Sequence, residues 1–243
     1  MASLNQLDPV IAHFLLNWSN SVQRNFHPRN WSYEQHIYSI YRMIRYLSMS
    51  INVENFRDGC LGYAQPSNGD GREFFNTALG GCPDIPHFAM NQHDSIINQF
   101  SPSFSVDFSK HAVISHPWSK DRIVNCSMLT DIKDTKHDFL DPKFVKSDPI
   151  KFDLILPWGI AIISENGNHR AMGAILSGAG SMPISCIGRA YDFESFILNI
   201  DPAIIDEYST PLGRALYEIA LLMSQTAKLH GQSIIGQNWF THY

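Results

Sequence analysis

The feature that most constrains this chain is an apolar run that ends in a tight turn and a segment of small residues. The apolar run spans residues 154–163, the turn contains Asn166-Gly167-Asn168, and Ala171-Met172-Gly173-Ala174-Ile175 follows. A short apolar run bounded by turn residues is typical of a buried strand. Small residues after the turn allow a helix to lie close to a sheet. The stretch therefore predicts a strand, a turn and a helix over residues 168–177.

The composition fits a folded chain with one core domain. The chain has 243 residues, 44% of them hydrophobic and 17% charged, whereas charged residues average roughly 25% in soluble domains. The net charge of -5 gives no broad attraction to nucleic acid or to an anionic membrane. The sequence contains neither a run of 18 apolar residues nor a basic leader followed by an apolar segment. We expect a cytoplasmic protein without a membrane span.

The cysteines and histidines predict no metal site in the protein. The four cysteines form no C-x-x-C pair, which argues against a zinc ribbon or a thioredoxin-like motif. Four of the eleven histidines could in principle form a metal cluster, but their spacings match no compact metal motif: His111, His116, His137 and His169.

Two helices are predicted near the N-terminus, over residues 8–25 and 32–50. Ser32 and Gln35 have the spacing of a capping box for the second helix. Its apolar side chains recur at helical spacing on one face: Ile37, Ile40, Tyr41, Ile44 and Leu47. We therefore expect a helical region over residues 1–56, followed by a turn-rich connection over residues 57–103 that is rich in glycine and contains a short helix near Phe74.

The remainder, residues 104–243, predicts an α+β core with a small mixed sheet. Alternating apolar residues from Phe104 to Phe108, and then Ala112-Val113-Ile114, favour a strand that ends near Pro117. A further strand is expected near residues 183–187. Helical spacing over residues 212–230 predicts a long C-terminal helix.

The start of the predicted helix 168–177 is the first candidate site. A helix N-terminus has free backbone N–H groups and favours an anion such as a phosphate. Gly167 lets the turn backbone approach a ligand without a Cβ in the way, and Asn168 begins the helix on which a phosphate would lie. His169 can donate to a phosphate or move a proton, and Arg170 can bind phosphate oxygens with two N–H groups. Glu165 is a candidate base. The alternative is a helix-capping turn, in which Asn166 or Asn168 caps the helix, His169 fills a polar gap and Arg170 is solvated.

Pro117-Trp118-Ser119-Lys120-Asp121-Arg122 is the second candidate site, because it also follows a strand and begins a helix. Ser119 is the expected N-cap. Lys120 and Arg122 could face the same anion as Arg170. The alternative is an ordinary capped helix with charged residues at the surface.

The two segments carry a resemblance to the ParB/sulfiredoxin superfamily. Glu165-Asn166-Gly167-Asn168-His169-Arg170-Ala171 resembles the Gly-x-His-Arg or Gly-x-Arg-Arg box of that superfamily, and residues 117–122 resemble its earlier segment with proline and arginine. Over residues 104–228 the chain also resembles a family of uncharacterised bacterial proteins. The shared motifs are Asp107-Phe108-Ser109, Pro117-Trp118, Leu156-Pro157-Trp158-Gly159-Ile160 and Gly167-Asn168-His169.

The resemblance implies a ParB/sulfiredoxin-like core that binds nucleotide phosphates and, in some members, transfers a phosphoryl group or hydrolyses CTP. The serine kinases of the superfamily use a carboxylate base, for which the resemblance implies Glu165 and then Asp121 in this sequence. This sequence departs from the superfamily's motif at two positions, and each departure argues against one of the superfamily's activities. Asn168 replaces the cysteine of sulfiredoxin-like proteins, which argues against sulfinic-acid repair. His169 replaces the first of two consecutive arginines in ParB-like proteins, and no basic helix-turn-helix follows, which argues against DNA partition.

Three functions are therefore compared. The first is nucleotide binding, with a nucleoside triphosphate and Mg²⁺ as ligands and a phosphotransferase or NTPase activity. The second is a catalytically inactive module that binds a protein partner, for example in phage or plasmid conflict. The aromatic residues of the N-terminal helices suit such a surface, and core packing explains them equally well: Trp18, Trp31, Tyr33, Tyr38, Tyr41 and Tyr46. The third, a nuclease or nucleic-acid-binding protein, ranks last because no set of carboxylates suggests a metal site.

Overall fold

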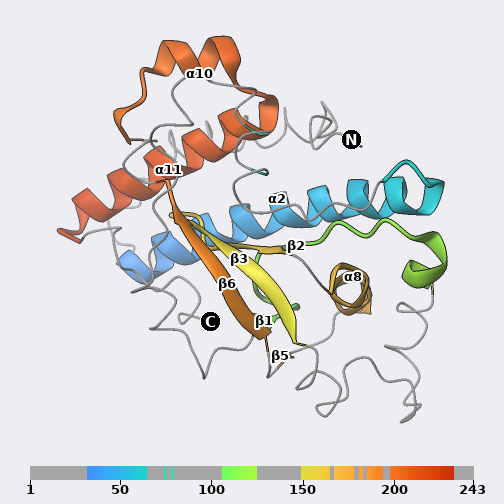
Figure 1. Ribbon diagram of the computed structural model, residues 1–243. Helices are drawn as coiled ribbons and strands as arrows, with labels where there is room; N and C mark the ends of the chain where they lie inside the picture. The colour runs from blue at the N-terminus through green and yellow to red at the C-terminus, as the bar shows by residue number, and fades with distance from the viewer. Residues whose placement is uncertain are drawn as a thin grey trace.

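The fold is built on a mixed sheet of four strands in the order β2-β4-β3-β6, in a computed structural model (Figure 1). The structure describes residues 32–64, 74, 78, 106–124, 149–164, 167–177, 181–182, 185–193 and 198–232. The strands are β2 (Val113–Ile114), β3 (Ile150–Leu156), β4 (Ile160–Ile163) and β6 (Ser185–Asp192). β4 runs parallel to β2 and antiparallel to β3, and β3 runs parallel to β6. With its long helices this is an α+β protein, as predicted.

The apolar run forms two strands, so the prediction of a single strand over residues 154–163 is wrong. β3 and β4 are antiparallel neighbours, and Ile155 pairs with Ile160 across the turn between them. The peptide bond before Pro157 is cis, and Gly159 has a φ of 67°, a left-handed conformation that glycine adopts readily. The sequence does not indicate the hairpin, because the turn residue Trp158 is as apolar as the residues of the two strands.

Helices cover both faces of the sheet, which explains why β4 is apolar at every position. On one face, Ala171 and Ala174 of α8 (Asn168–Ser177) pack with Phe152 and Leu154. On the other face, α2 (Tyr33–Leu61) and α11 (Pro211–Leu229) pack against residues that include Ile155. The small residues of α8 therefore lie against the sheet, as predicted, and the helix has the predicted bounds.

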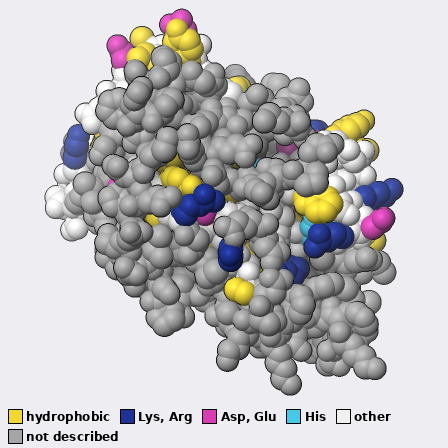
Figure 2. Space-filling view, in the orientation of Figure 1, with side chains coloured by type: hydrophobic (Ala, Val, Ile, Leu, Met, Phe, Trp, Pro, Cys, Tyr) yellow, Lys and Arg dark blue, Asp and Glu magenta, His cyan; other side chains and the backbone are white. Residues whose placement is uncertain are grey.

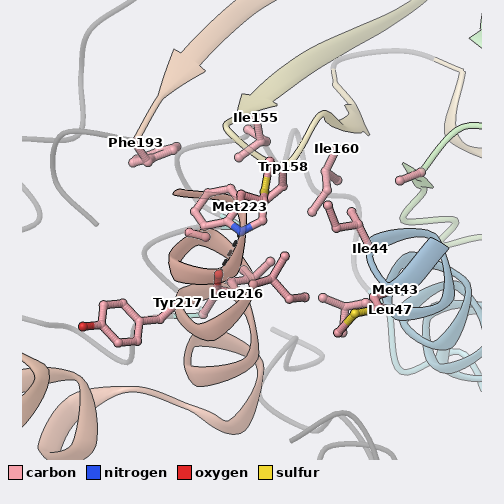
Figure 3. Packing of buried hydrophobic residues seen from close by; sticks show 14 of the residues in the cluster. Met43, Ile44, Leu47, Ile155, Trp158, Ile160, Phe193, Leu216, Tyr217 and Met223 are labelled. Atoms are coloured by element: carbon pink, nitrogen blue, oxygen red, sulfur yellow. Dashed lines mark hydrogen bonds between the residues drawn. The ribbon is translucent and has the colours of Figure 1, made fainter. Parts of the chain in front are cut away.

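Trp158 connects the β3–β4 turn to α11. Its indole is fully buried, and its Nε1–H donates to the backbone oxygen of Leu216 at 2.8 Å. Figure 3 shows the ring between Phe193 and Met223, with Ile155 above it. A buried tryptophan needs a partner for its N–H group, and here a carbonyl of the neighbouring helix supplies it.

α2 begins as the sequence predicts but continues beyond the predicted end at residue 50. The Ser32 side chain accepts from the Gln35 N–H, and the Gln35 side chain accepts from the Ser32 N–H at 2.8 Å, which confirms the capping box. The helix passes through Gly59 and ends at Gly62, which has a φ of 74°. The prediction of turns from residue 57 onward is therefore wrong up to Leu61. Gly59 lies inside the helix and packs closely against Pro117 and Ile123.

The other elements complete the outer parts of the fold. β1 (Val106–Asp107) pairs with β5 (Ser181–Met182), and α10 (Pro202–Tyr208), which was not predicted, begins at the N-cap Asp201. α11 confirms the predicted C-terminal helix, and the strand expected near residue 183 begins at Ser185. The predicted helix 8–25 and most of the turn-rich connection lie outside the described residues. Within the described part of the chain, no helix has both the length and the hydropathy needed to span a membrane.

Candidate functional site

The two candidate segments meet at one edge of the sheet. β2 and β4 are parallel neighbours, with Val113 paired to Ala161 and Ile114 paired to Ile162, so both strands end at the same edge. Residues 115–119 follow β2, and the start of α8 follows β4 after a short connection. In α/β sheets, ligands bind outside the carboxyl ends of adjacent parallel strands. The sheet topology thus brings together two segments that are about 50 residues apart in the sequence.

Asn168 joins the first residue of α8 to the backbone that follows β2. Its side-chain Oδ1 accepts from the His116 N–H at 2.7 Å. The Ser115 hydroxyl lies 2.6 Å from the Asn168 backbone oxygen and 3.2 Å from Oδ1. Both side chains are buried, so these hydrogen bonds are shielded from water. Asn168 therefore positions the segment 115–119.

His169, the next residue of α8, extends this connection along the segment that follows β2. Its Nε2 accepts from the backbone N–H groups of Ser119 at 3.0 Å and of Trp118 at 3.3 Å. Burial, with a smaller effect of the Arg122 charge, lowers the pKa of His169 to about 4. A neutral ring is required, since a protonated Nε2 has no lone pair to accept with. The lone pair that a general base would use is therefore already engaged.

The indole of Trp118 links His169 to Arg122. The Trp118 and His169 rings meet edge to face, with centroids 5.0 Å apart and planes at 81°. The Arg122 guanidinium carbon lies 5.5 Å from the Trp118 ring centroid, within the range of a cation–π contact. Figure 2 shows basic side chains next to a histidine and a hydrophobic side chain over the position of α8. Arg122 is consequently held close to the start of α8.

The rest of the second segment forms a short helix, as predicted. Residues 120–124 are helical, and the Ile123 N–H donates to the Ser119 backbone oxygen at 2.9 Å. Lys120, Asp121 and Arg122 are exposed, whereas Ile123 is buried. The three charged side chains are thus on the solvent side of the segment, where they can reach a ligand.

Gly167 and Arg170 occupy the interior more deeply than expected. Gly167 has a φ of 100°, and a Cβ at this position would lie 2.9 Å from Cγ1 of Ile150. Its packing against β3 is by itself a sufficient reason for glycine. Arg170 is only 7% exposed, so it is not the solvated side chain of the capping alternative. Glu165, the predicted base, lies outside the described residues.

Two amide side chains of α2, which the sequence did not point to, support the site from the other side. β2 is at the edge of the sheet, and Asn52 takes the place of a neighbouring strand. Its Nδ2 donates to the Val113 oxygen at 2.6 Å, and its Oδ1 accepts from the Ser115 N–H at 2.9 Å. Asn55 donates to the Ser115 oxygen at 2.8 Å. An asparagine on the buried face of a helix was the available signal, because Asn is a weak helix former.

Gly59 allows α2 to approach the same segment closely. A Cβ at Gly59 would lie 2.6 Å from the Pro117 oxygen and 2.7 Å from Cδ1 of Ile123. Both distances are shorter than real Cβ contacts, so any larger residue would push α2 and the segment apart. The candidate site therefore depends on three elements: the end of α2, residues 115–123 and the start of α8.

The histidines considered as a metal cluster have other contacts where they are described. His111 accepts through Nδ1 from the Asp107 N–H at 2.9 Å, in the turn between β1 and β2. His137 lies outside the described residues. Among the residues that the structure describes, no three His, Cys, Asp or Glu side chains gather closely enough to hold a metal ion.

These features define an α+β protein in which two strand-to-helix segments meet at one edge of a mixed sheet. The profile of a family described as "Family of unknown function (DUF6710)" matches residues 12–225 of the chain. The chain therefore belongs to this family, which agrees with the resemblance to uncharacterised proteins. A search of curated proteins and a search of solved structures each found no match.

Proposed function

We propose that the protein binds a nucleoside triphosphate with Mg²⁺ through its phosphates, where residues 117–122 meet the start of α8. One observation carries this proposal: His169 accepts from the backbone of Trp118 and Ser119 and so joins the two segments. The resemblance to the ParB/sulfiredoxin superfamily is a second support, since the same two segments carry it.

The charges at this junction suit a phosphate chain. Arg122 and Lys120 are exposed on the short helix, and the first turn of α8 adds the positive end of a helix dipole. Arginine binds phosphate with two parallel N–H groups, and lysine acts as a point charge. Mg²⁺ usually binds through one or two carboxylates and the phosphates themselves, so Asp121 or Glu165 would complete its coordination.

The proposal gives His169 a positioning role. Its Nε2 is engaged by two backbone N–H groups, and its low pKa keeps the ring neutral. A phosphotransferase or NTPase activity would need another base, for which Asp121 and Glu165 are the candidates. Nucleotide binding is thus the core of the proposal, and phosphoryl transfer is its catalytic extension in a cytoplasmic protein.

The proposal is tested by thermal unfolding with ATP, CTP, GTP, ADP and NAD, each with and without Mg²⁺. A ligand at 100 times its Kd adds about 2.7 kcal/mol, which raises the Tm of a chain of this size by roughly 5–10 °C. We expect Arg122→Ala to lose this shift and Arg214→Ala to keep it. Arg214 is a matched control, because its guanidinium pairs with Asp206 on α10. No shift with any nucleotide would contradict the proposal.

A second candidate function, binding of a protein partner, is favoured by the outer face of α2. Four side chains at helical spacing are exposed there: Tyr38, Tyr46, Met49 and Val53. Tyr41, which the sequence grouped with the other aromatic residues, is buried and belongs to the core. Capture of a partner by the wild type but not by Met49→Glu would support this function. Loss of the nucleotide-induced Tm shift in Met49→Glu would argue that the face is only structural.

A further inference from the structure

The Arg122 guanidinium is held by an aromatic ring rather than by a carboxylate. Arg57, Arg189 and Arg214 each donate to a carboxylate. Arg122 instead lies over the Trp118 ring, with its guanidinium carbon 5.5 Å from the ring centroid, and forms no ion pair with any residue that the structure describes. Stacking uses the face of the guanidinium and leaves the N–H groups at its edge available. An available planar fork of donors is the geometry that binds two oxygens of a phosphoryl group.

The position of Trp118 is itself determined by the site. Its backbone N–H donates to His169, and its ring meets the His169 ring edge to face. Pro117, the preceding residue, is packed against Gly59 of α2. The indole therefore has a fixed place between α2 and α8, and the guanidinium over it is directed by a rigid support rather than by a flexible side chain alone.

We propose that Trp118 is a positioning residue of the phosphate site, which holds Arg122 so that its N–H edge contacts the terminal phosphoryl group of the ligand. This inference rests on the proposed function. It adds that Arg122 makes the decisive phosphate contact and that Trp118 acts only through it. An isolated guanidinium loses side-chain freedom on binding, and the stacked one has lost much of it beforehand.

A double-mutant cycle tests the inference, with Mg²⁺ and inorganic tripolyphosphate as the probe, because every nucleoside triphosphate shares this phosphate tail. Isothermal titration gives the affinity of the wild type, Trp118→Leu, Arg122→Ala and the double variant. We expect Arg122→Ala to weaken binding roughly tenfold or more, and Trp118→Leu roughly three- to fivefold. In the Arg122→Ala background, Trp118→Leu should have no further effect. Trp118→Phe, which keeps an aromatic face, should restore most of the affinity.

The matched control is a second stacked arginine on α2. The Arg42 guanidinium carbon lies 4.7 Å from the Tyr38 ring centroid, a similar contact away from the site. Arg42→Ala should leave tripolyphosphate binding unchanged. Equal weakening by Trp118→Leu in both Arg122 backgrounds would overturn the inference, since a general structural effect does not depend on Arg122. Wild-type affinity in Trp118→Leu would also overturn it. If the wild type binds neither tripolyphosphate nor any nucleotide, the proposed function itself fails.

Discussion

The imidazoles of His36 and His230 share one hydrogen bond that joins the first turn of α2 to the end of α11. Nδ1 of His36 lies 2.9 Å from Nε2 of His230, and the ring centroids are 5.1 Å apart. One ring must donate and the other accept, so at least one imidazole is neutral. His36 is buried, and Tyr33 meets the His230 ring edge to face. The pair therefore closes the core at the end of the molecule away from the candidate site.

Replacement of His230 by phenylalanine should destabilise the protein by about 1–2 kcal/mol. The ring contacts with Tyr33 and His36 can be retained, but the hydrogen bond is lost and a buried imidazole nitrogen loses this partner. Urea unfolding at neutral pH measures the loss. His230→Gln, which keeps a polar partner, should recover part of it. Equal stability of His230→Phe and the wild type would show that the hydrogen bond contributes little.

Replacement of Gly59 by alanine should destabilise the protein by about 1–3 kcal/mol through overpacking. The new methyl group would lie 2.6 Å from the Pro117 oxygen, and a backbone atom cannot move away as cheaply as a side-chain end. Because Pro117 directly precedes Trp118, the residue that holds Arg122, the affinity for the nucleotide should fall as well. Gly62→Ala is the comparison at the end of α2, where a Cβ would meet no atom within 4 Å and only the strain of φ 74° remains.

Replacement of Asn52 by alanine should destabilise the protein by about 2–4 kcal/mol. The change removes two hydrogen bonds and leaves the Val113 oxygen and the Ser115 N–H at the sheet edge without the amide that serves them. Asn55→Ala removes one hydrogen bond of a partly buried group, so its cost should be nearer 1 kcal/mol. Denaturant midpoints of the two variants give the comparison. A larger loss in Asn55→Ala would contradict the role assigned to Asn52.

The stability of the protein should fall as the pH is lowered from about 6.5 towards 4. The pKa of His169 is lowered from 6.5 to about 4 by burial, and the charge of Arg122 adds to this. Above pH 6.5 the ring is neutral in both states. Below pH 6.5 the unfolded chain binds a proton that the folded chain does not bind, so the free energy of unfolding decreases until the pH approaches 4.

His169→Gln separates this contribution from other titrations. Glutamine keeps an oxygen that can accept from the Trp118 and Ser119 N–H groups but does not titrate, so the variant should lose less stability than the wild type between pH 7 and pH 4.5. Burial also lowers the pKa of His116 to about 4, so His116→Gln should likewise reduce the loss of stability between pH 7 and pH 4.5. An unchanged pH dependence in His169→Gln would contradict the buried, neutral state of this ring.

The sequence alone determined several elements of this protein, because their signals are local. The Ser32–Gln35 capping box lies within one helical turn, and the stripe of α11 repeats at helical spacing. The start of α8 at Asn168 follows from a turn next to small residues. Each of these signals acts between residues at most a few positions apart, which is why the sequence predicts them. The hairpin around Trp158 was not predicted, because an apolar turn residue that becomes buried gives no local signal of a turn.

Only the tertiary structure decided what the residues of the candidate site do. The sequence placed Asn168 and His169 at the start of a helix. It left two roles open for them, binding of a ligand or capping of the helix. Their partners are the backbone of residues 116–119, about 50 positions away, and Asn52 reaches Val113 across 61 positions. Such contacts exist only when the sheet brings β2 beside β4. A lone pair can serve a ligand or a neighbouring N–H group, and the choice depends on what the fold places within hydrogen-bond distance.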